Sequence, residues 1–205
     1  MITIVDYGLG NALAFVNMYR RLNIPVSVAN TSEDLASSDK LILPGVGSFD
    51  HAMQKLNQSG MRQALEKLVL QQGVPILGIC VGMQMLAKSS DEGKLPGLGW
   101  IDGTVKKFDS LKIMRGNTYL PHMGWNDVKP VVEASLFKGI EQDGRFYFLH
   151  SYYFECQKQS DILAMTDYGV QFSSAVGHDH VYGVQFHPEK SHHFGSQLLK
   201  NFGEL

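Results

Sequence analysis

The first half of the chain alternates between short, uniformly apolar runs and segments in which apolar residues recur at helical spacing. The apolar runs predict strands at residues 2–5, 25–28, 41–43 and 75–79. Strands without polar alternation are typical of a parallel sheet whose two faces are both covered by helices. The pattern therefore predicts an α/β fold with a mostly parallel central sheet and flanking helices.

The segments between these strands predict the helices. A helical period after the turn at residues 8–11 links Leu13, Val16, Asn17 and Arg20. Ser32 is placed to cap a short helix that runs to Ala36. Ser59 is placed to cap another helix, which carries an apolar face made by Met61, Leu65, Leu68 and Val69.

The second half of the chain is richer in strand patterns. Strands are predicted at residues 103–108, 145–149, 162–165 and 181–186, with turn signals at residues 116–117 and 177–179. A final helix is predicted at residues 194–202. No repeat or linker interrupts the chain, so we expect one domain over residues 1–205, with additional antiparallel strands in its second half.

Charge and cysteine usage exclude several classes of protein. The 18 basic and 20 acidic side chains give a net charge of −2, which argues against a nucleic-acid partner. The longest apolar stretch, residues 74–83, is too short to span a bilayer, so no membrane association is expected. Residues 1–6 lack the basic start of a signal peptide, and two cysteines make no disulfide framework. A cytoplasmic protein with reduced thiols is expected.

The sharpest local signal is the turn at residues 78–82, where Cys80 lies between two glycines at the end of a predicted strand. Glycines relieve the crowding of a sharp strand-to-helix turn, and such a turn presents its central residue as a nucleophile. The following helix would run over residues 81–87, and its N-terminus favours a thiolate. The alternative is a buried structural cysteine without chemistry.

A cysteine nucleophile needs a base, and His187 directly follows the predicted strand at residues 181–186. Glu189, two residues further on, is placed to orient the imidazole. The segment therefore predicts a triad of Cys80, His187 and Glu189. The alternative is a histidine at a strand end with no catalytic part.

An oxyanion hole is the remaining requirement of this chemistry. The backbone N–H of Val81, next to the nucleophile, would be one donor. The glycine-rich segment at residues 44–47 could supply another from Gly45 or Val46. On its own this segment is more typical of an ordinary loop after a strand.

Two rival patterns are weaker. The segment at residues 7–11 suggests a dinucleotide site, but Leu13 stands where the third glycine of that motif belongs. His187, Glu189, His192 and His193 suggest a metal cluster, but their spacing fits no common metal motif. We therefore expect no cofactor and no metal.

The segments at residues 78–84 and 183–189 together resemble the two diagnostic motifs of the class I glutamine amidotransferases of the triad type. Within that family, further segments are similar to glutaminase subunits of imidazole glycerol phosphate synthases. These segments lie at residues 6–11, 44–47, 120–126 and 188–191. The resemblance covers nearly the whole chain.

The resemblance implies an activity. Cys80 would attack the side-chain amide of L-glutamine, His187 would transfer the proton to departing ammonia, and water would release glutamate. In the family, ammonia passes through a tunnel to a (β/α)₈ cyclase subunit, with which the glutaminase forms a heterodimer. The products of that subunit are imidazole glycerol phosphate, for histidine synthesis, and an aminoimidazole carboxamide ribotide, for purine synthesis.

Further roles follow from the resemblance by matched position. Gln84, Ser151 and Tyr152 correspond to residues that bind the substrate. A second group corresponds to positions near the interface with the synthase subunit: Asn11, Met123, Trp125 and Lys190.

Two features depart from the commonest histidine-pathway pattern, namely the paired His192 and His193 and the residue Trp100. Both resemble a paralogous branch in bacterial surface-polysaccharide gene sets, in which ammonia modifies a sugar. The histidine pathway is the favoured interpretation, and this branch is the alternative. A catalytically silent binding or regulatory module and a free-standing cysteine hydrolase are the further alternatives.

Overall fold

The computed structural model describes residues 1–115, 118–140 and 144–205, so the turn predicted at residues 116–117 lies outside the described residues. Its centre is a parallel sheet with the strand order β2-β1-β3-β4-β12. These strands are β1 (Ile2–Val5), β2 (Val26–Ala29), β3 (Lys40–Gly45), β4 (Ile76–Cys80) and β12 (Val181–Val184). All the strands predicted in the first half are confirmed.

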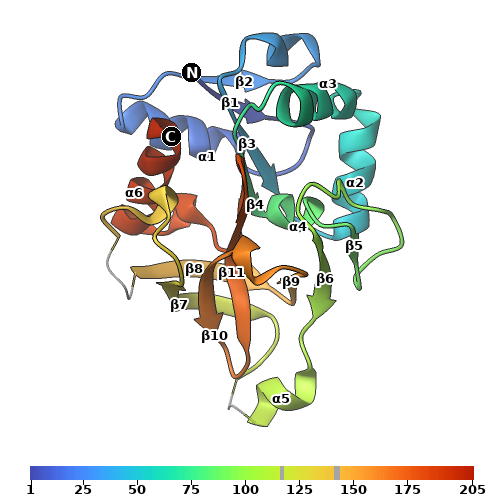
Figure 1. Ribbon diagram of the computed structural model, residues 1–205, viewed down its shortest axis with the longest axis vertical. Helices are drawn as coiled ribbons and strands as arrows, with labels where there is room; N and C mark the ends of the chain where they lie inside the picture. The colour runs from blue at the N-terminus through green and yellow to red at the C-terminus, as the bar shows by residue number, and fades with distance from the viewer. Residues whose placement is uncertain (116–117, 141–143) are drawn as a thin grey trace.

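Helices cover both faces of these parallel strands (Figure 1). One face carries α1 (Ala12–Arg21) and α6 (His192–Glu204), which contact each other. The other face carries α2 (Phe49–Gln58), α3 (Arg62–Glu66) and α4 (Val81–Met85). A π-helical turn, Lys67–Gln71, continues α3, and a short 3₁₀ helix, Glu33–Ser37, precedes β3.

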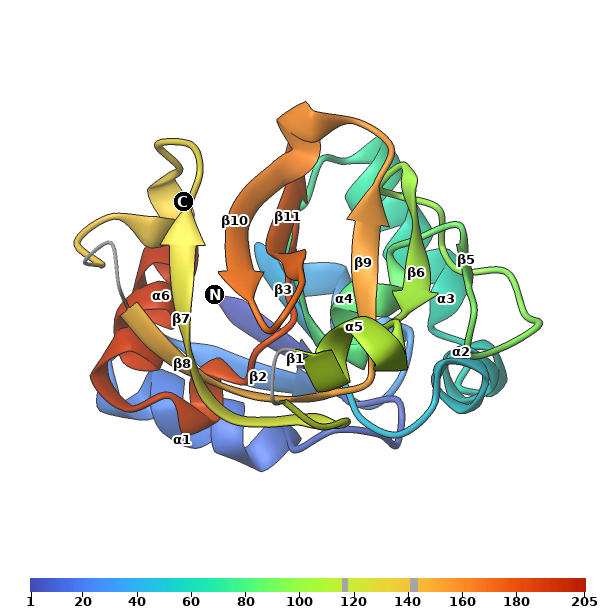
Figure 2. The ribbon, with the colours of Figure 1, turned by 90° about the horizontal axis from the view of Figure 1, so that it is seen from below.

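Antiparallel strands extend the sheet beyond β12. The next strands are β11 (Gln171–His178), β10 (Ile162–Asp167), β7 (His122–Pro130) and β8 (Gly144–His150). A side branch from β11 holds β9 (Tyr152–Cys156), β6 (Gly103–Lys107) and β5 (Ser89–Ser90). Figure 2 shows β7 and β8 to one side of β10 and β11, and β9 and β6 to the other; α5 (Ser110–Arg115) lies at this end. The predicted α/β class with added antiparallel strands is confirmed.

Three details of the first helices differ from the sequence prediction. In α1 the buried residues are Phe15, Val16 and Tyr19, whereas Leu13 is 65% exposed. The two aromatic rings bury more apolar surface than Leu13 could, so they set which face meets the core. The helical period therefore predicts the helix correctly; of its apolar residues Val16 is buried, whereas Leu13 is not.

The predicted cap at Ser32 is also wrong. Ser32 has helical backbone angles and makes no side-chain cap. The Asp34 carboxylate instead accepts hydrogen bonds from the backbone N–H groups of Asn30 and Thr31, at 2.9 and 3.0 Å. The cap predicted at Ser59 is wrong as well: α3 begins at Arg62, Met61 holds its cap position, and no side chain caps it. Ser59 ends α2, and its hydroxyl accepts a hydrogen bond from the Met61 N–H at 3.2 Å in the turn between the two helices.

Candidate active site

Cys80 ends β4 and begins α4 in a strained turn. Its backbone angles are φ 55° and ψ −113°, outside the conformations that side chains usually permit. A Cβ at Gly78 would lie 2.6 Å from the carbonyl oxygen of Gly82, and a Cβ at Gly82 would overlap the carbonyl oxygen of Leu43. Both glycines are therefore required by space, as the sequence pattern predicts.

His187 follows β12, which pairs in parallel with β4, so the ends of the two strands meet. The His187 Nδ1–H donates to Glu189 Oε1 at 2.8 Å, and both side chains are only 6% exposed. The His187 backbone N–H donates to the carbonyl of Tyr147 at 2.8 Å, which fixes the position of the ring relative to β8. The structure thus brings together the three residues predicted as a triad.

The charge balance at His187 favours its protonated form. Burial lowers the pKa of this imidazole, but hydrogen bonds with Cys80 and Glu189, and the charges of those groups, raise it to about 10. An imidazolium next to the nucleophile can give its proton to a leaving group, as a general acid must. The site therefore holds a proton donor beside Cys80.

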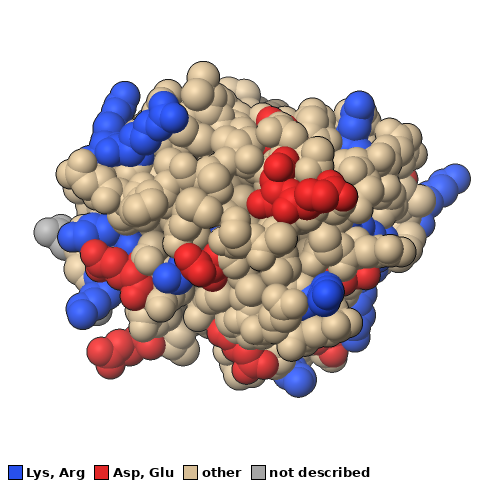
Figure 3. Space-filling view, turned by 90° about the horizontal axis from the view of Figure 1, so that it is seen from above, with Lys and Arg blue, Asp and Glu red and all other residues tan. Residues whose placement is uncertain are grey.

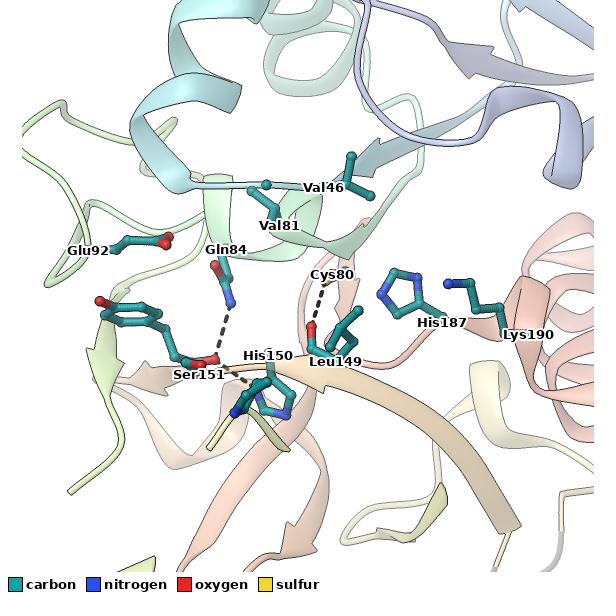
Figure 4. Close-up of a pocket in the computed structure, with 13 residues that line it drawn as sticks. Val46, Cys80, Val81, Gln84, Glu92, Leu149, His150, Ser151, His187 and Lys190 are labelled. Carbon is teal, nitrogen blue, oxygen red and sulfur yellow. Dashed lines mark hydrogen bonds between the residues drawn. The ribbon is translucent and has the colours of Figure 1, made fainter. Parts of the chain in front are cut away.

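These residues open into a cavity of about 330 Å³ (Figure 4). Cys80 and His187 lie at one end of the pocket, and Gln84 and Glu92 lie toward the other. The segment that contains Ser151 completes the wall opposite α4. A small polar molecule with charged groups at one end and a reactive carbonyl at the other fits this arrangement.

The predicted substrate residue Gln84 has its amide fixed in one orientation. Its Nε2 donates to the carbonyl of Tyr152 at 3.2 Å and to Gln185 Oε1 at 3.0 Å. Both N–H groups are therefore used, and the amide oxygen is left to accept a hydrogen bond from a ligand. Ser151 and Tyr152 both line the pocket, as Gln84 does.

Reasoning from the sequence missed several residues at the site, among them Gln185, which lies behind Cys80, and Glu92, which lines the pocket. Gln185 donates from Nε2 to the sulfur of Cys80 at 3.8 Å; a polar residue inside an otherwise apolar strand pattern was the available signal. Glu92 lines the pocket and accepts a hydrogen bond from the Phe49 N–H at 2.9 Å through Oε2. No local motif marks Glu92, because its loop enters the site only in the folded chain.

The residues predicted for the oxyanion hole lie beside Cys80. β3 continues two residues beyond the predicted strand, and this extension pairs Gly45 with Cys80. Val46 and Val81 line the pocket. The Tyr7 hydroxyl donates to the Pro44 carbonyl at 2.8 Å, so the loop that begins at Tyr7 is hydrogen-bonded to this strand end.

The predicted interface residues on β7 lie on an exposed face next to the pocket. Met123 is 60% exposed and pairs with Leu149, a pocket residue, while Trp125 is 40% exposed and pairs with Tyr147. Exposed apolar side chains therefore gather at this mouth, and we call them the apolar rim. The rim consists of Val46, Met123, Trp125 and Leu149.

The other predicted interface residues lie in different settings. Lys190 is exposed, lines the pocket, and holds its Nζ 5.5 Å from the centre of the Tyr147 ring. Asn11 is exposed and caps α1, accepting a hydrogen bond from the Ala14 N–H at 3.1 Å. His192, considered above as a metal ligand, stacks on Trp125 with ring centres 4.9 Å apart.

The described residues contain neither a group of metal-ligating side chains nor a helix that could span a membrane. Among residues 1–115, 118–140 and 144–205, no three His, Cys, Asp or Glu side chains are grouped to hold a metal ion. No helix in these ranges is long and apolar enough to cross a membrane. On the face shown in Figure 3, acidic and basic side chains are scattered in small groups among uncharged ones.

Comparisons with known proteins agree on one family. A family model described as "Glutamine amidotransferase class-I" matches residues 3–204. A Bdellovibrio bacteriovorus protein named imidazole glycerol phosphate synthase subunit HisH is 64% identical over the full length of both chains. A protein of the same name from Leptospira interrogans is 50% identical, and one from Pseudomonas aeruginosa, named subunit HisH 2, is 46% identical, each over the full length of both chains.

Solved structures are similar at lower identity. A crystal structure of a glutamine amidotransferase superposes with a TM-score of 0.76 at 20% identity, covering 99% of this chain and 97% of that one. A glutamine amidotransferase from Thermotoga maritima gives a TM-score of 0.65 at 16% identity, covering 99% of this chain and 82% of that one. These two likenesses show the shared fold.

Proposed function

This chain belongs to the class I glutamine amidotransferase family, and we propose that it is the glutaminase subunit of an imidazole glycerol phosphate synthase in histidine biosynthesis. The observation that carries the glutaminase part is that Cys80 and His187 meet at one end of the pocket, with Glu189 hydrogen-bonded to His187 behind it. The full-length identity with subunits of that name supports the assignment to this synthase rather than to a sugar-modifying relative.

Glutamine suits the pocket at both of its ends. Its α-ammonium would face the Glu92 carboxylate, and its α-carboxylate would meet backbone groups of Ser151 and Tyr152. The free oxygen of the Gln84 amide would accept a hydrogen bond from one of the substrate's N–H groups. These contacts would hold the side-chain amide of the substrate over Cys80 at the other end.

The chemistry then proceeds in two halves. The Cys80 sulfur attacks the amide carbon, and backbone N–H groups of Gly45 or Val46 and of Val81 stabilise the oxyanion that forms. The C–N bond breaks as His187 gives its proton to the departing nitrogen, which leaves as ammonia. His187 next takes a proton from water, which attacks the thioester, and glutamate leaves as the C–S bond breaks. Glu189 holds the imidazole in position throughout.

The ammonia would pass to an acceptor held by another chain, as expected of one subunit of a synthase. We propose that the apolar rim and Lys190 contact a (β/α)₈ synthase subunit in a heterodimer. Exposed apolar groups around an active-site mouth are typical of a partner surface. The synthase would use the ammonia to form imidazole glycerol phosphate and the aminoimidazole carboxamide ribotide.

The nucleophile is tested by a matched pair of cysteine variants. Cys80→Ser should remove glutaminase activity, because a hydroxyl needs stronger activation than a thiol to attack an amide. Cys156→Ser should keep it, because burial, together with the Asp161 charge, raises the pKa of the Cys156 thiol to about 12. The measurement is glutamate release in the presence of the synthase subunit, with both variants checked for folding by circular dichroism.

Covalent labelling supplies the opposing outcome. A diazo-ketone analogue of glutamine should modify Cys80 in the wild type, as peptide mass spectrometry would show. Labelling of Cys156 with Cys80 left free would overturn the assignment of the nucleophile. If the complex hydrolysed glutamine but made no imidazole glycerol phosphate, the assignment to this synthase would be overturned. The assignment as a glutaminase would stand.

A further inference from the structure

A pair of buried histidines joins β7 to β8 behind the pocket. His122 and His150 are paired in register, and His122 Nδ1 lies 2.9 Å from His150 Nε2. Their exposed fractions are 2% and 6%. The His122 ring is stacked between Tyr168 and Phe148, with ring centres at 3.8 and 4.6 Å. Neither histidine belongs to the triad.

The hydrogen bonds of this pair run in one direction only. His150 Nδ1 lies 2.8 Å from the carbonyl oxygen of Tyr152, which can only accept, so His150 Nδ1 carries a proton. Burial, with the nearby charge of His122, lowers the pKa of His150 to about 3, so the ring is neutral and its Nε2 is an acceptor. His122 must therefore donate to it from Nδ1.

The far end of the chain of bonds agrees with this direction. Neutral His122 has Nε2 as an acceptor, and the Asn126 side-chain nitrogen lies 3.3 Å from it. The orientation of the Asn126 amide is set independently, because its nitrogen donates to the Asp167 carbonyl at 2.8 Å and its oxygen accepts from the Asp127 N–H at 2.8 Å. Backbone groups thus fix the polarity at both ends.

We propose that His122 is a positioning residue for the bound glutamine, acting through His150 on the Tyr152 carbonyl and on the Gln84 amide. The inference rests on the proposed function. The Tyr152 carbonyl accepts from both His150 and Gln84, so the two donors fix each other's orientation. His122 keeps His150 in the tautomer that donates toward Tyr152. Gln84 then presents its oxygen to the substrate.

The proposal predicts a loss of affinity for substrate without a loss of chemistry. In His122→Phe the aromatic stack is preserved but the donor to His150 is lost. His150 Nε2 is then a buried acceptor without a donor, which is unfavourable. We expect KM for glutamine to rise about tenfold and kcat to change less than about twofold. His122→Gln, whose amide can donate to His150 Nε2, should restore most of the affinity.

The control is another histidine that bonds to a backbone carbonyl, far from the pocket. His180 Nε2 donates to the Val69 carbonyl at 2.7 Å, and His180→Phe should leave KM unchanged. All variants are assayed in the complex with the synthase subunit. A general weakening of the fold would lower the active fraction, and so kcat, in both Phe variants. Unchanged KM in His122→Phe, while the wild type turns over glutamine, would overturn the proposal.

A second measurement needs no variant. Nitrogen-15 NMR of the wild-type chain distinguishes the two neutral histidine tautomers, and both His122 and His150 should carry their proton on Nδ1. An Nε2 proton on either ring would overturn the proposal even if a variant failed to fold. Absence of any glutaminase activity in the wild-type complex would count against the proposed function, whereas the tautomers would still test the orientation of the pair.

Discussion

At the scale of single residues, the site depends on strain at Cys80 and on charge at His187. The positive φ of Cys80 turns its side chain out of the sheet and toward the pocket. The Glu189 carboxylate accepts from His187 through Oε1, while its Oε2 is buried without a hydrogen-bond partner in the described part of the chain. Glu189 therefore acts on the imidazole and on nothing else that the described residues offer.

The base and its orienting residue should differ in their effects. His187→Asn should lower kcat by about 10²–10⁴-fold, because proton transfer in both halves of the reaction is lost. Glu189→Gln should lower it less, because an amide oxygen can still accept from Nδ1. The measurement is steady-state glutamate release near neutral pH. Equal activity of His187→Asn and the wild type would refute the triad.

At the scale of elements, the turn between β4 and α4 is held by steric contact with β3. Gly82 lies so close to the Leu43 carbonyl that no side chain fits, and a Cβ at Gly45 would overlap the backbone nitrogen of Gly82. The β7–β8 pair supplies a second constraint, through the buried His122 and His150. Each pair of elements therefore positions one wall of the pocket.

The steric contact at Gly82 can be tested by comparing its replacement by alanine with the same replacement at another helical glycine, Gly203. Gly82→Ala should lower the free energy of unfolding by about 1–3 kcal/mol or more, because β3 must move to admit the methyl group. Gly203→Ala, in α6, should change it by less than about 1 kcal/mol, because the atom nearest its Cβ would be the flexible end of Ile24, at 3.0 Å, and alanine favours the helix. Urea unfolding measures both, and equal effects would contradict the steric account.

The histidine pair should make the fold sensitive to acid. Burial lowers the pKa of His122 to about 4, and burial with the His122 charge lowers that of His150 to about 3. As pH falls from about 6.5 toward 4, the unfolded chain binds protons that the folded chain does not, so the free energy of unfolding falls. His187 has the opposite sign, since its raised pKa stabilises the fold below about pH 6.5 and this stabilisation is lost toward pH 10.

Urea unfolding at pH 7 and pH 5 separates these contributions. The wild type should lose about 2 kcal/mol per buried histidine over this interval, in addition to what its carboxylates contribute. The double variant His122→Gln, His150→Gln should be less stable at pH 7, but its free energy of unfolding should fall less than that of the wild type between pH 7 and pH 5. The same pH dependence in both proteins would show that the two histidines are not neutral in the fold.

At the scale of the whole molecule, the pocket and the apolar rim share one mouth. Val46 belongs to both, because it lines the pocket, is 42% exposed, and lies in the segment proposed for the oxyanion hole. Gly47, with φ +85°, gives the next peptide unit rotational freedom. A partner seated on the rim would therefore touch the segment that completes the catalytic machinery.

We predict little glutaminase activity from the isolated chain and a large rise with the synthase subunit and its acceptor. One peptide flip at residues 45–47 would add or remove one oxyanion donor, which is worth about 10²–10³-fold in kcat. A partner shifts this equilibrium only by its differential affinity for the two states. Rates of the chain alone and in the complex decide this, and full turnover without the partner would favour an independent hydrolase.

Trp125→Ala tests the role of the rim in this activation. Trp125 keeps 40% of its surface exposed, so its replacement should weaken activation by the synthase more than it lowers the melting temperature. Val131→Ala serves as a control, because Val131 is an exposed apolar residue beyond the end of β7 and outside the rim. Equal activation of the Trp125→Ala and wild-type chains would exclude this part of the rim from the interface.

The sequence by itself determined the features whose causes are local. The parallel strands follow from uninterrupted apolar runs, and the nucleophile turn at residues 78–82 follows from the space that only glycine leaves. His187 and Glu189 are two residues apart, so their hydrogen bond is also a local matter. The family could be predicted because each of its two diagnostic motifs is a continuous segment of the chain, at residues 78–84 and 183–189.

The tertiary structure alone decided which distant groups meet. Glu92 reaches the pocket from a loop, and Gln84, Tyr152 and Gln185 share hydrogen bonds across more than sixty residues of chain. β7 escaped prediction because polarity and burial are reversed along it: the polar His122 is buried, while its apolar neighbours Met123 and Trp125 are exposed. The buried face of α1 was likewise set by what the sheet could cover. Packing and hydrogen bonding between remote segments minimise the free energy of the whole chain, and no local pattern records those partners.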